Sequence, residues 1–141
     1  MPEPLEVTVT STDQKLGYTA ALRTLAPVTM DYIPPFGSGQ GYLPLELLLM
    51  SLAACSGGAL SLMLKKMGKT VAGVKVTARG IRKEQHPTGF RTITLVFQVT
   101  SPDADELTVQ KAIPLAESVC PVWSMLQNNA EIKTEYKVVP V

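Results

Sequence analysis

The sequence predicts an α+β domain organised around one long apolar helix. Three short segments with the alternation of β-strands come before residue 34. An uncharged stretch of eighteen residues then separates Glu46 from Lys65, and two strands, a pair of helices and a final strand follow it. Strands and helices that occur in separate blocks, rather than in strict alternation, are typical of the α+β class.

The region before the helix is predicted to form three strands and a loop. Residues 5–10 alternate apolar and polar side chains, which is the pattern of a half-buried strand. Two further strands are expected around residues 18–24 and 28–33. Residues 34–41 contain two prolines and three glycines, so we expect a loop that leads into the helix. Loops on rigid scaffolds often carry functional sites.

The long helix is predicted over residues 45–66, with Pro44 at its first position and Gly68 after its end. At 1.5 Å per residue it would be roughly 30 Å long. A helix that is apolar on all sides needs cover on all sides, and a single sheet has only one buried face. We therefore expect a second copy of the chain to provide the missing cover.

The same stretch is long enough to be considered as a membrane span. It contains three serines and two glycines, and its flanks have the alternation of strands in a soluble domain. No aromatic belt or basic loop accompanies it. The first residues, Met-Pro-Glu-Pro, lack the basic and apolar regions of a signal peptide. The prediction is therefore a cytoplasmic protein with no membrane partner.

Three strands are predicted after the long helix, at residues 71–83, 91–100 and 132–138, with a turn at 84–89. Between the last two strands we expect a pair of helices. Asp103 and Glu106 have the spacing of a capping box at the start of the first, and Pro114 should kink it. Pro121 fits the first position of a short helix over residues 121–128, with Cys120 as its cap residue.

Composition limits the classes of function. A chain of 141 residues is expected to form one domain, 1–141. It is 45% hydrophobic and 18% charged, which favours a surface partly covered by a partner subunit. The net charge of +1 does not support nucleic-acid binding. The two cysteines lie 65 residues apart without a Cys-x-x-Cys motif, so we predict neither a thioredoxin-type motif nor a metal site or other cofactor.

Cys55 and Cys120 are the candidate reactive residues. On an ideal helix Cys55 shares its face with small residues, which would allow close approach to the sulfur. Cys120, at a helix N-terminus, would have a stabilised thiolate because of the helix dipole and the free amides. The alternative is that both are inert core thiols, since cysteine is among the most buried residue types.

Two motifs resemble those of the OsmC and organic hydroperoxide resistance family. One is the central-helix signature, in which Pro44 precedes Cys55 by eleven residues; the other is Lys111-Ala112 followed by Cys120-Pro121-Val122. The resemblance implies the OsmC-like fold, with antiparallel sheets wrapped around a long buried central helix, and an intertwined homodimer with two sites at its interface.

The resemblance also implies a reaction. Cys55 would reduce an organic hydroperoxide and become a sulfenic acid, and Cys120 would resolve it as a disulfide. An external dithiol, of which a lipoyl group is one type, would then reduce the pair. The alternative is a non-catalytic dimer on the same scaffold that binds a small molecule or senses oxidation.

The sequence departs from the family pattern beside the thiol. Family members place Glu directly after the proline and pair it with an Arg from the preceding loop. Here Glu46 comes one residue later, about 180° around the helix from Cys55, and no Arg occurs between residues 23 and 79. Arg79, Arg82, His86 and the displaced Glu46 are the candidates for activating the thiolate or binding substrate. The alternative for the two arginines and the histidine is that they lie on a solvated strand end and turn and have no role at the thiol.

Overall fold

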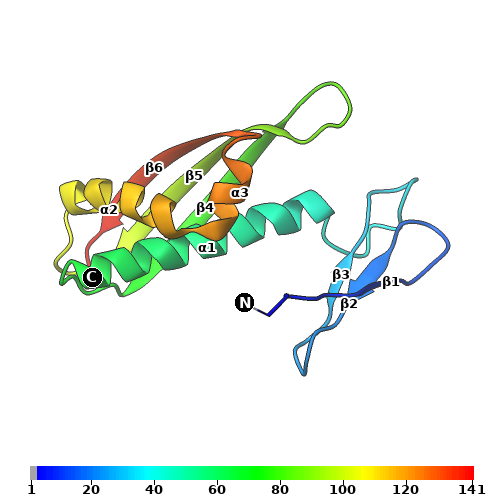
Figure 1. The fold of residues 1–141 in the computed structure, drawn as a ribbon, viewed down its shortest axis with the longest axis horizontal. Coiled ribbons are helices and arrows are strands. Elements are labelled where there is room, and N and C mark those ends of the chain that lie inside the picture. The colour runs from blue at the N-terminus through cyan, green and yellow to red at the C-terminus, as the bar shows by residue number, and fades with distance from the viewer. Residues whose placement is uncertain (1–2) are drawn as a thin grey trace. The chain divides into compact units, whose positions relative to one another are not determined.

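The structure, a computed structural model, describes residues 3–141 and divides into two compact units (Figure 1). The first unit ends at Leu47 and the second covers Leu48–Val141. Helix α1, Pro44–Lys66, begins in the first unit and runs through the second. The prediction of a single domain is not tested by this division.

The first unit is a small antiparallel sheet with the strand order β1-β2-β3. Its strands are β1 (Val9–Ser11), β2 (Tyr18–Ala20) and β3 (Val28–Met30), each shorter than the segment predicted for it. The β1–β2 turn is closed by the Asp13 carboxylate, which accepts from the backbone N–H groups of Lys15 and Gly17 at 2.9 and 3.1 Å. No hydrophobic side chain among residues 3–47 is buried.

The predicted loop at 34–41 is present and is folded around one buried carboxylate. Asp31 is only 2% exposed and accepts from the backbone N–H groups of Tyr32, Ser38 and Gln40 at 2.7, 3.2 and 3.2 Å. These hydrogen bonds stabilise the charged form and outweigh desolvation, so they hold the pKa of Asp31 below its ordinary value. Gly37 is required beside it, because a Cβ there would lie 2.3 Å from the Asp31 Oδ1 atom.

The second unit is a three-stranded sheet with its helices on one face (Figure 1). It contains β4 (Gly73–Arg82), β5 (Phe90–Thr100), α2 (Glu106–Val119), α3 (Pro121–Leu126) and β6 (Glu131–Val139). The strand order is β4-β5-β6. Alternate residues of β5 are fully buried, as predicted, and pack with buried residues of α1, α2 and α3 in one core: Leu52, Leu60, Leu64, Ile93, Leu95, Phe97, Val99, Val109, Ala112, Ile113, Ala116, Cys120 and Trp123.

One strand pair corrects the expectation of antiparallel sheets. β4 and β5 are antiparallel, but β5 and β6 are parallel, with Phe97 opposite Tyr136. The 30 residues between Thr100 and Glu131 contain α2 and α3. They return the chain to the end of the sheet at which β5 begins, and β6 starts there. A crossover of this length is what a parallel pair requires.

The predicted capping box of α2 is also corrected. The N-cap is Asp105, whose side chain accepts from the Thr108 backbone N–H at 2.8 Å. Asp103 instead accepts from the Thr70 N–H at 2.9 Å and so joins the α1–β4 connection to the start of α2. Pro114 lies inside α2 on its exposed side, and the helix runs through it to Val119.

Helix α1 has the predicted ends, but one chain does not bury it on all sides. Leu52, Leu60 and Leu64 are fully buried on the face toward the core. The opposite side carries a stripe of exposed, uncharged residues, called here the bare stripe: Met50, Ser51, Ala54, Gly58 and Leu62. By length and mean hydropathy alone (2.0), α1 could also cross a membrane, and 28% of its most apolar window is buried. The buried leucines, however, make one face of α1 part of a protein core.

Candidate functional site

The site is built by the middle of α1 and by the turn between α2 and α3. Cys55 lies near the centre of α1, is partly buried and packs against the edge of the core. Cys120 is the residue that ends α2 and begins α3, as predicted, with Pro121 at the first position of α3. Its backbone is fixed from both sides, since its N–H donates to the Glu117 carbonyl and its carbonyl accepts from the Ser124 N–H at 3.1 Å.

The fold brings these two cysteines into contact. The Cys120 thiol is 1% exposed and forms a hydrogen bond with Cys55. Both thiols are free rather than joined in a disulfide. Residues 65 positions apart in the chain therefore share one site, which the sequence predicts only through the family resemblance.

The predicted stabilisation of the Cys120 thiolate is wrong for this reduced state. Burial and the hydrogen bond with Cys55 raise the pKa of Cys120 to about 11 from an ordinary value of 9.0. The backbone N–H groups of Trp123 and Val122 at the start of α3 lower it, but by less. Burial of Cys120 therefore raises its pKa by more than the N-terminus of the six-residue helix α3 lowers it.

Trp123 is a part of the site that the sequence analysis did not identify. It is 2% exposed, lies in the same core as Cys120, and follows it by three residues on the first turn of α3. It is the one tryptophan of the chain. The signal that could have identified it is its spacing from Cys120, because residues three apart share a helix face.

Glu46 caps α1 and does not lie with Cys55. Its Oε1 accepts from the Leu43 backbone N–H at 2.8 Å, which fixes the side chain at the first turn of the helix. Cys55 follows nine residues later on the other side of α1. Within this chain Glu46 is therefore a helix-capping residue.

The three candidate cations also lie away from the thiols within the chain. Arg79 is opposite Thr94 in the β4–β5 register, whereas its neighbour Ala78 is opposite the buried Leu95, so Arg79 is on the sheet face away from the core. Arg82 donates from its guanidinium to the Thr88 carbonyl at 2.7 Å and to the Thr88 hydroxyl. These bonds close the predicted β4–β5 turn.

His86 is exposed on this turn and lines a shallow polar cavity of about 450 Å³ with five neighbours: Lys83, Glu84, Gln85, Pro87 and Arg91. Among residues 3–141, no three His, Cys, Asp or Glu side chains are grouped so that they could hold a metal ion.

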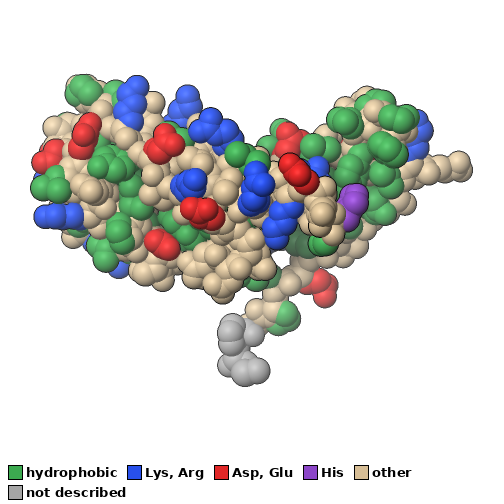
Figure 2. Space-filling model, turned by 90° about the horizontal axis from the view of Figure 1, so that it is seen from above, with side chains coloured by type: hydrophobic (Ala, Val, Ile, Leu, Met, Phe, Trp, Pro, Cys, Tyr) green, Lys and Arg blue, Asp and Glu red, His purple; other side chains and the backbone are tan. Residues whose placement is uncertain are grey.

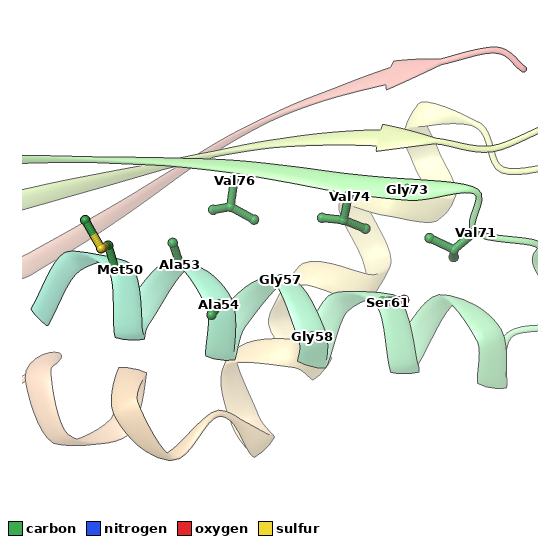
Figure 3. Close-up of a pocket in the computed structure, with 10 residues that line it drawn as sticks. All are labelled: Met50, Ala53, Ala54, Gly57, Gly58, Ser61, Val71, Gly73, Val74 and Val76. Atoms are coloured by element: carbon green, nitrogen blue, oxygen red, sulfur yellow. The ribbon is translucent and has the colours of Figure 1, made fainter. Parts of the chain in front are cut away.

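A second cavity, apolar and about 520 Å³ in volume, lies between α1 and β4 (Figure 3). Val74 and Val76 of β4 point across it toward α1, where Gly57 lies on the facing side of the helix. Gly57 is needed for this approach, because a Cβ there would lie 2.8 Å from Val76 Cγ2. Ala54 and Gly58, which belong to the bare stripe, form part of its wall. The cavity is an open groove beside the helix segment that carries Cys55.

Two thiols in contact, a partly accessible one on a central helix and a buried one at the turn between two further helices, define a dithiol site in an α+β protein. The chain belongs to the OsmC-like protein family, whose sequence profile matches residues 37–135. It is 34% identical over 97 residues to protein YhfA of Escherichia coli K12, covering 68% of this chain and 72% of that protein.

Two further similarities support the assignment. Peroxiredoxin OsmC of Escherichia coli K12 is 34% identical over 105 residues, covering 73% of this chain and 71% of that protein. The crystal structure of an OsmC-like protein from Mycoplasma pneumoniae superposes with a TM-score of 0.80 at 25% identity, covering 100% of this chain and 99% of that one. The predicted OsmC-like fold is therefore confirmed.

Proposed function

We propose that the protein is a thiol-dependent peroxidase that reduces organic hydroperoxides and acts in oxidative stress defence in the cytoplasm. The observation that carries this proposal is the contact between Cys55 and Cys120, in which only Cys55 is partly exposed. A relative named as a peroxiredoxin supports it.

The reaction proceeds in two steps at these sulfurs. The Cys55 thiolate attacks the terminal peroxide oxygen, the O–O bond breaks, and the alkoxide leaves and takes up a proton, which gives an alcohol and a Cys55 sulfenic acid. The Cys120 sulfur then attacks the Cys55 sulfur, water leaves and a disulfide forms. An external dithiol, a lipoyl group being one type, reduces this disulfide and becomes oxidised itself.

The surroundings of Cys55 favour an organic substrate. The uncharged residues Ala54, Gly58 and Leu62 lie near it on the exposed part of α1, and the apolar groove runs beside them. Apolar surface of this kind gains more from burying a hydrocarbon chain than from contacting hydrogen peroxide, by about 25 cal/mol per Å² of apolar area removed from water.

We further propose that the working form is an intertwined homodimer. The first unit has no buried hydrophobic side chain among its described residues, and more than half of its large apolar side chains are exposed. Figure 2 shows hydrophobic side chains, in green, on the surface of the molecule. A segment of this size whose residues 3–47 bury no hydrophobic side chain needs another surface against which to fold. The bare stripe of α1 needs the same, and a second copy satisfies both.

The group that activates Cys55 is then expected from the second copy. Within one chain, Glu46 is used in capping and Arg79 lies on the outer sheet face. The β4–β5 turn, with Arg82 and the exposed His86, is the element whose cations a second copy could present.

The missing Arg and Glu pair favours one other function, a dimer that senses oxidation or binds a small molecule without turnover. In this case the thiols would form a disulfide on oxidation, and no catalytic rate would follow because Arg79 and Arg82 are both positioned away from Cys55 within the chain.

Consumption of cumene hydroperoxide with dihydrolipoamide as the reductant tests the proposal. We expect turnover by the wild-type protein and none by Cys55→Ser, which lacks the attacking sulfur. Cys120→Ser should react once and accumulate a sulfenic acid at Cys55 that dimedone traps. A folded wild-type protein that forms the disulfide with diamide yet consumes no hydroperoxide would support the sensing function instead.

A further inference from the structure

The two sulfurs differ in their access to a reductant. Cys120 is 1% exposed, and its burial comes from the second unit alone, since it lies in one core with α1, β5, α2 and α3. Trp123, which is 2% exposed, lies in the same core one helical turn away. Cys55 is partly exposed at the edge of this core.

Access decides which sulfur of a disulfide is attacked. Thiol–disulfide exchange requires a thiolate to approach one sulfur on the side opposite the S–S bond. For an attack on Cys120 the thiolate would have to enter the buried turn between α2 and α3, whose backbone is fixed by hydrogen bonds from Cys120 to Glu117 and from Ser124 to Cys120. For an attack on Cys55 it needs to reach only the edge of the core, where the Cys55 side chain is partly exposed.

We propose that the reductant attacks the Cys55 sulfur of the oxidised protein, so that Cys55 carries the mixed disulfide and Cys120 is the leaving group. This inference rests on the proposed function for the origin of the disulfide and extends it to the reductive half of the cycle. It also gives the peroxide and the reductant one common entrance, at Cys55.

The step balances as a two-electron transfer. One thiolate of a dithiol attacks Cys55 Sγ, the bond between Cys55 and Cys120 breaks, and Cys120 leaves as a thiolate that takes up a proton. The second thiol of the reductant, once deprotonated, attacks its own sulfur in the mixed disulfide. The Cys55 thiolate is released and the reductant closes to a cyclic disulfide, having supplied both electrons.

The high pKa of Cys120, about 11, acts in two directions here. It makes Cys120 a poorer leaving group, which slows the first attack. Once reduced, however, Cys120 is protonated at neutral pH and returns slowly to the mixed disulfide. A reductant with two thiols then has time to complete the step, which favours a dithiol over a monothiol.

Mass mapping of partly reduced protein tests the proposal directly. Wild-type protein is oxidised with diamide, exposed briefly to glutathione as a monothiol probe, quenched with acid and then alkylated with N-ethylmaleimide. We expect glutathione on Cys55 and N-ethylmaleimide on Cys120 in at least about tenfold excess over the reverse pattern. Equal labelling, or glutathione mainly on Cys120, would overturn the proposal.

The same protein in guanidinium chloride is the matched control, because unfolding exposes both sulfurs and the preference should disappear. A preference that persists in denaturant would show that the fold does not cause it, and would overturn the proposal. The single-cysteine variants give a second measurement: the rate of reaction with 5,5′-dithiobis(2-nitrobenzoate) should be at least about tenfold higher for Cys120→Ser than for Cys55→Ser.

These outcomes separate the two proposals. A disulfide that forms with diamide and accepts glutathione at Cys55, in a protein that does not consume hydroperoxide, would leave this inference standing and overturn the peroxidase. Failure of diamide to join Cys55 and Cys120 would overturn both.

Discussion

At the scale of single residues, the ionisation of Cys120 is decided by burial rather than by the helix that begins beside it. Burial and the hydrogen bond with Cys55 both raise its pKa, and two amides of a six-residue helix lower it less. The resolving thiol of the proposed cycle is therefore neutral in the reduced protein at pH 7, and it must lose its proton as it attacks the sulfenic acid.

Replacement of Cys55 should lower the pKa of Cys120 without returning it to the ordinary value. In Cys55→Ala the hydrogen bond and the charge interaction with the Cys55 sulfur are lost, but burial remains. The pKa of Cys120 should then lie between 9.0 and about 11. The rate of iodoacetamide alkylation of Cys120 as a function of pH measures it, with urea-unfolded variant as the control. A midpoint at or below that of the unfolded protein would contradict the effect of burial.

Asp31 is the second residue whose environment has a measurable consequence. Three backbone N–H groups donate to its carboxylate, and its pKa is lowered. The charged Asp31 carboxylate therefore contributes fully to the stability of the folded protein above the ordinary pKa of 3.8. This contribution is lost as the pH falls through the lowered pKa.

Asp31→Asn should destabilise the protein most at neutral pH, because one amide group would face N–H donors in the buried loop. Melting temperatures at pH 7 and pH 3 measure this: the loss should be clear at pH 7 and smaller at pH 3. Asp13→Asn is the matched control, since the Asp13 carboxylate holds an exposed turn with two N–H bonds. Equal effects of Asp31→Asn at both pH values would contradict a charge-dependent role.

At the scale of elements, α1 shows why some of the fold is predictable. Pro44 begins the helix, and Gly68 follows it with a φ of 81°, a conformation that glycine adopts without strain. Both signals are local, as is the alternation of Ile93, Leu95, Phe97 and Val99 in β5. The choice of the residue that caps α2, in contrast, depends on a contact from a distant part of the chain. Asp103 and Asp105 are both suitable residues, and the contact that occupies Asp103 comes from Thr70, 33 residues away.

Two adjacent glycines of α1 should respond differently to the same substitution. A Cβ on Gly57 would lie 2.8 Å from Val76 Cγ2, whereas one on Gly58 meets nothing within 4 Å in the chain. Helix propensity favours alanine at both by about 1 kcal/mol. Overpacking against β4 costs about 1–3 kcal/mol and applies to Gly57 alone.

Gly57→Ala should therefore have a free energy of unfolding about 1–3 kcal/mol lower than Gly58→Ala, as measured in urea at one protein concentration. Equal stabilities would show that the α1–β4 approach relaxes without cost. Gly58→Ala less stable than Gly57→Ala would contradict this order and would show that the proposed second copy packs more tightly on Gly58 than β4 packs on Gly57.

At the scale of the whole molecule, the pairing of the site could not be read from spacing. Cys55 and Cys120 meet because α1 packs on the face of the sheet that α2 and α3 also cover. The position of Arg79 depended on the β4–β5 register, since a shift of one residue exchanges the faces of a strand. Alternation alone allows either residue 78 or residue 79 to face the core, and the pairing of Ala78 with the buried Leu95 places Arg79 on the other face.

The homodimer leads to the last prediction. The first unit buries no hydrophobic side chain among residues 3–47, and the bare stripe of α1 is uncharged over its whole length. Light scattering at micromolar concentration should therefore give twice the chain mass of 15.2 kDa. The melting temperature should rise with protein concentration, because folding and association are then one equilibrium.

A charge placed in the bare stripe should separate the two copies. Gly58→Arg would bury an unpaired cation in the proposed interface, at a cost of about 3–5 kcal/mol, so the dimer should dissociate at least about 100-fold more readily. Gln110→Arg is the matched control, because Gln110 is exposed on α2 and away from the stripe. Sedimentation of both variants over a range of concentrations measures the effect. A wild-type monomer at micromolar concentration, or a Gly58→Arg variant as dimeric as Gln110→Arg, would show that a second copy does not cover α1. The first unit would then need another partner for its apolar side chains.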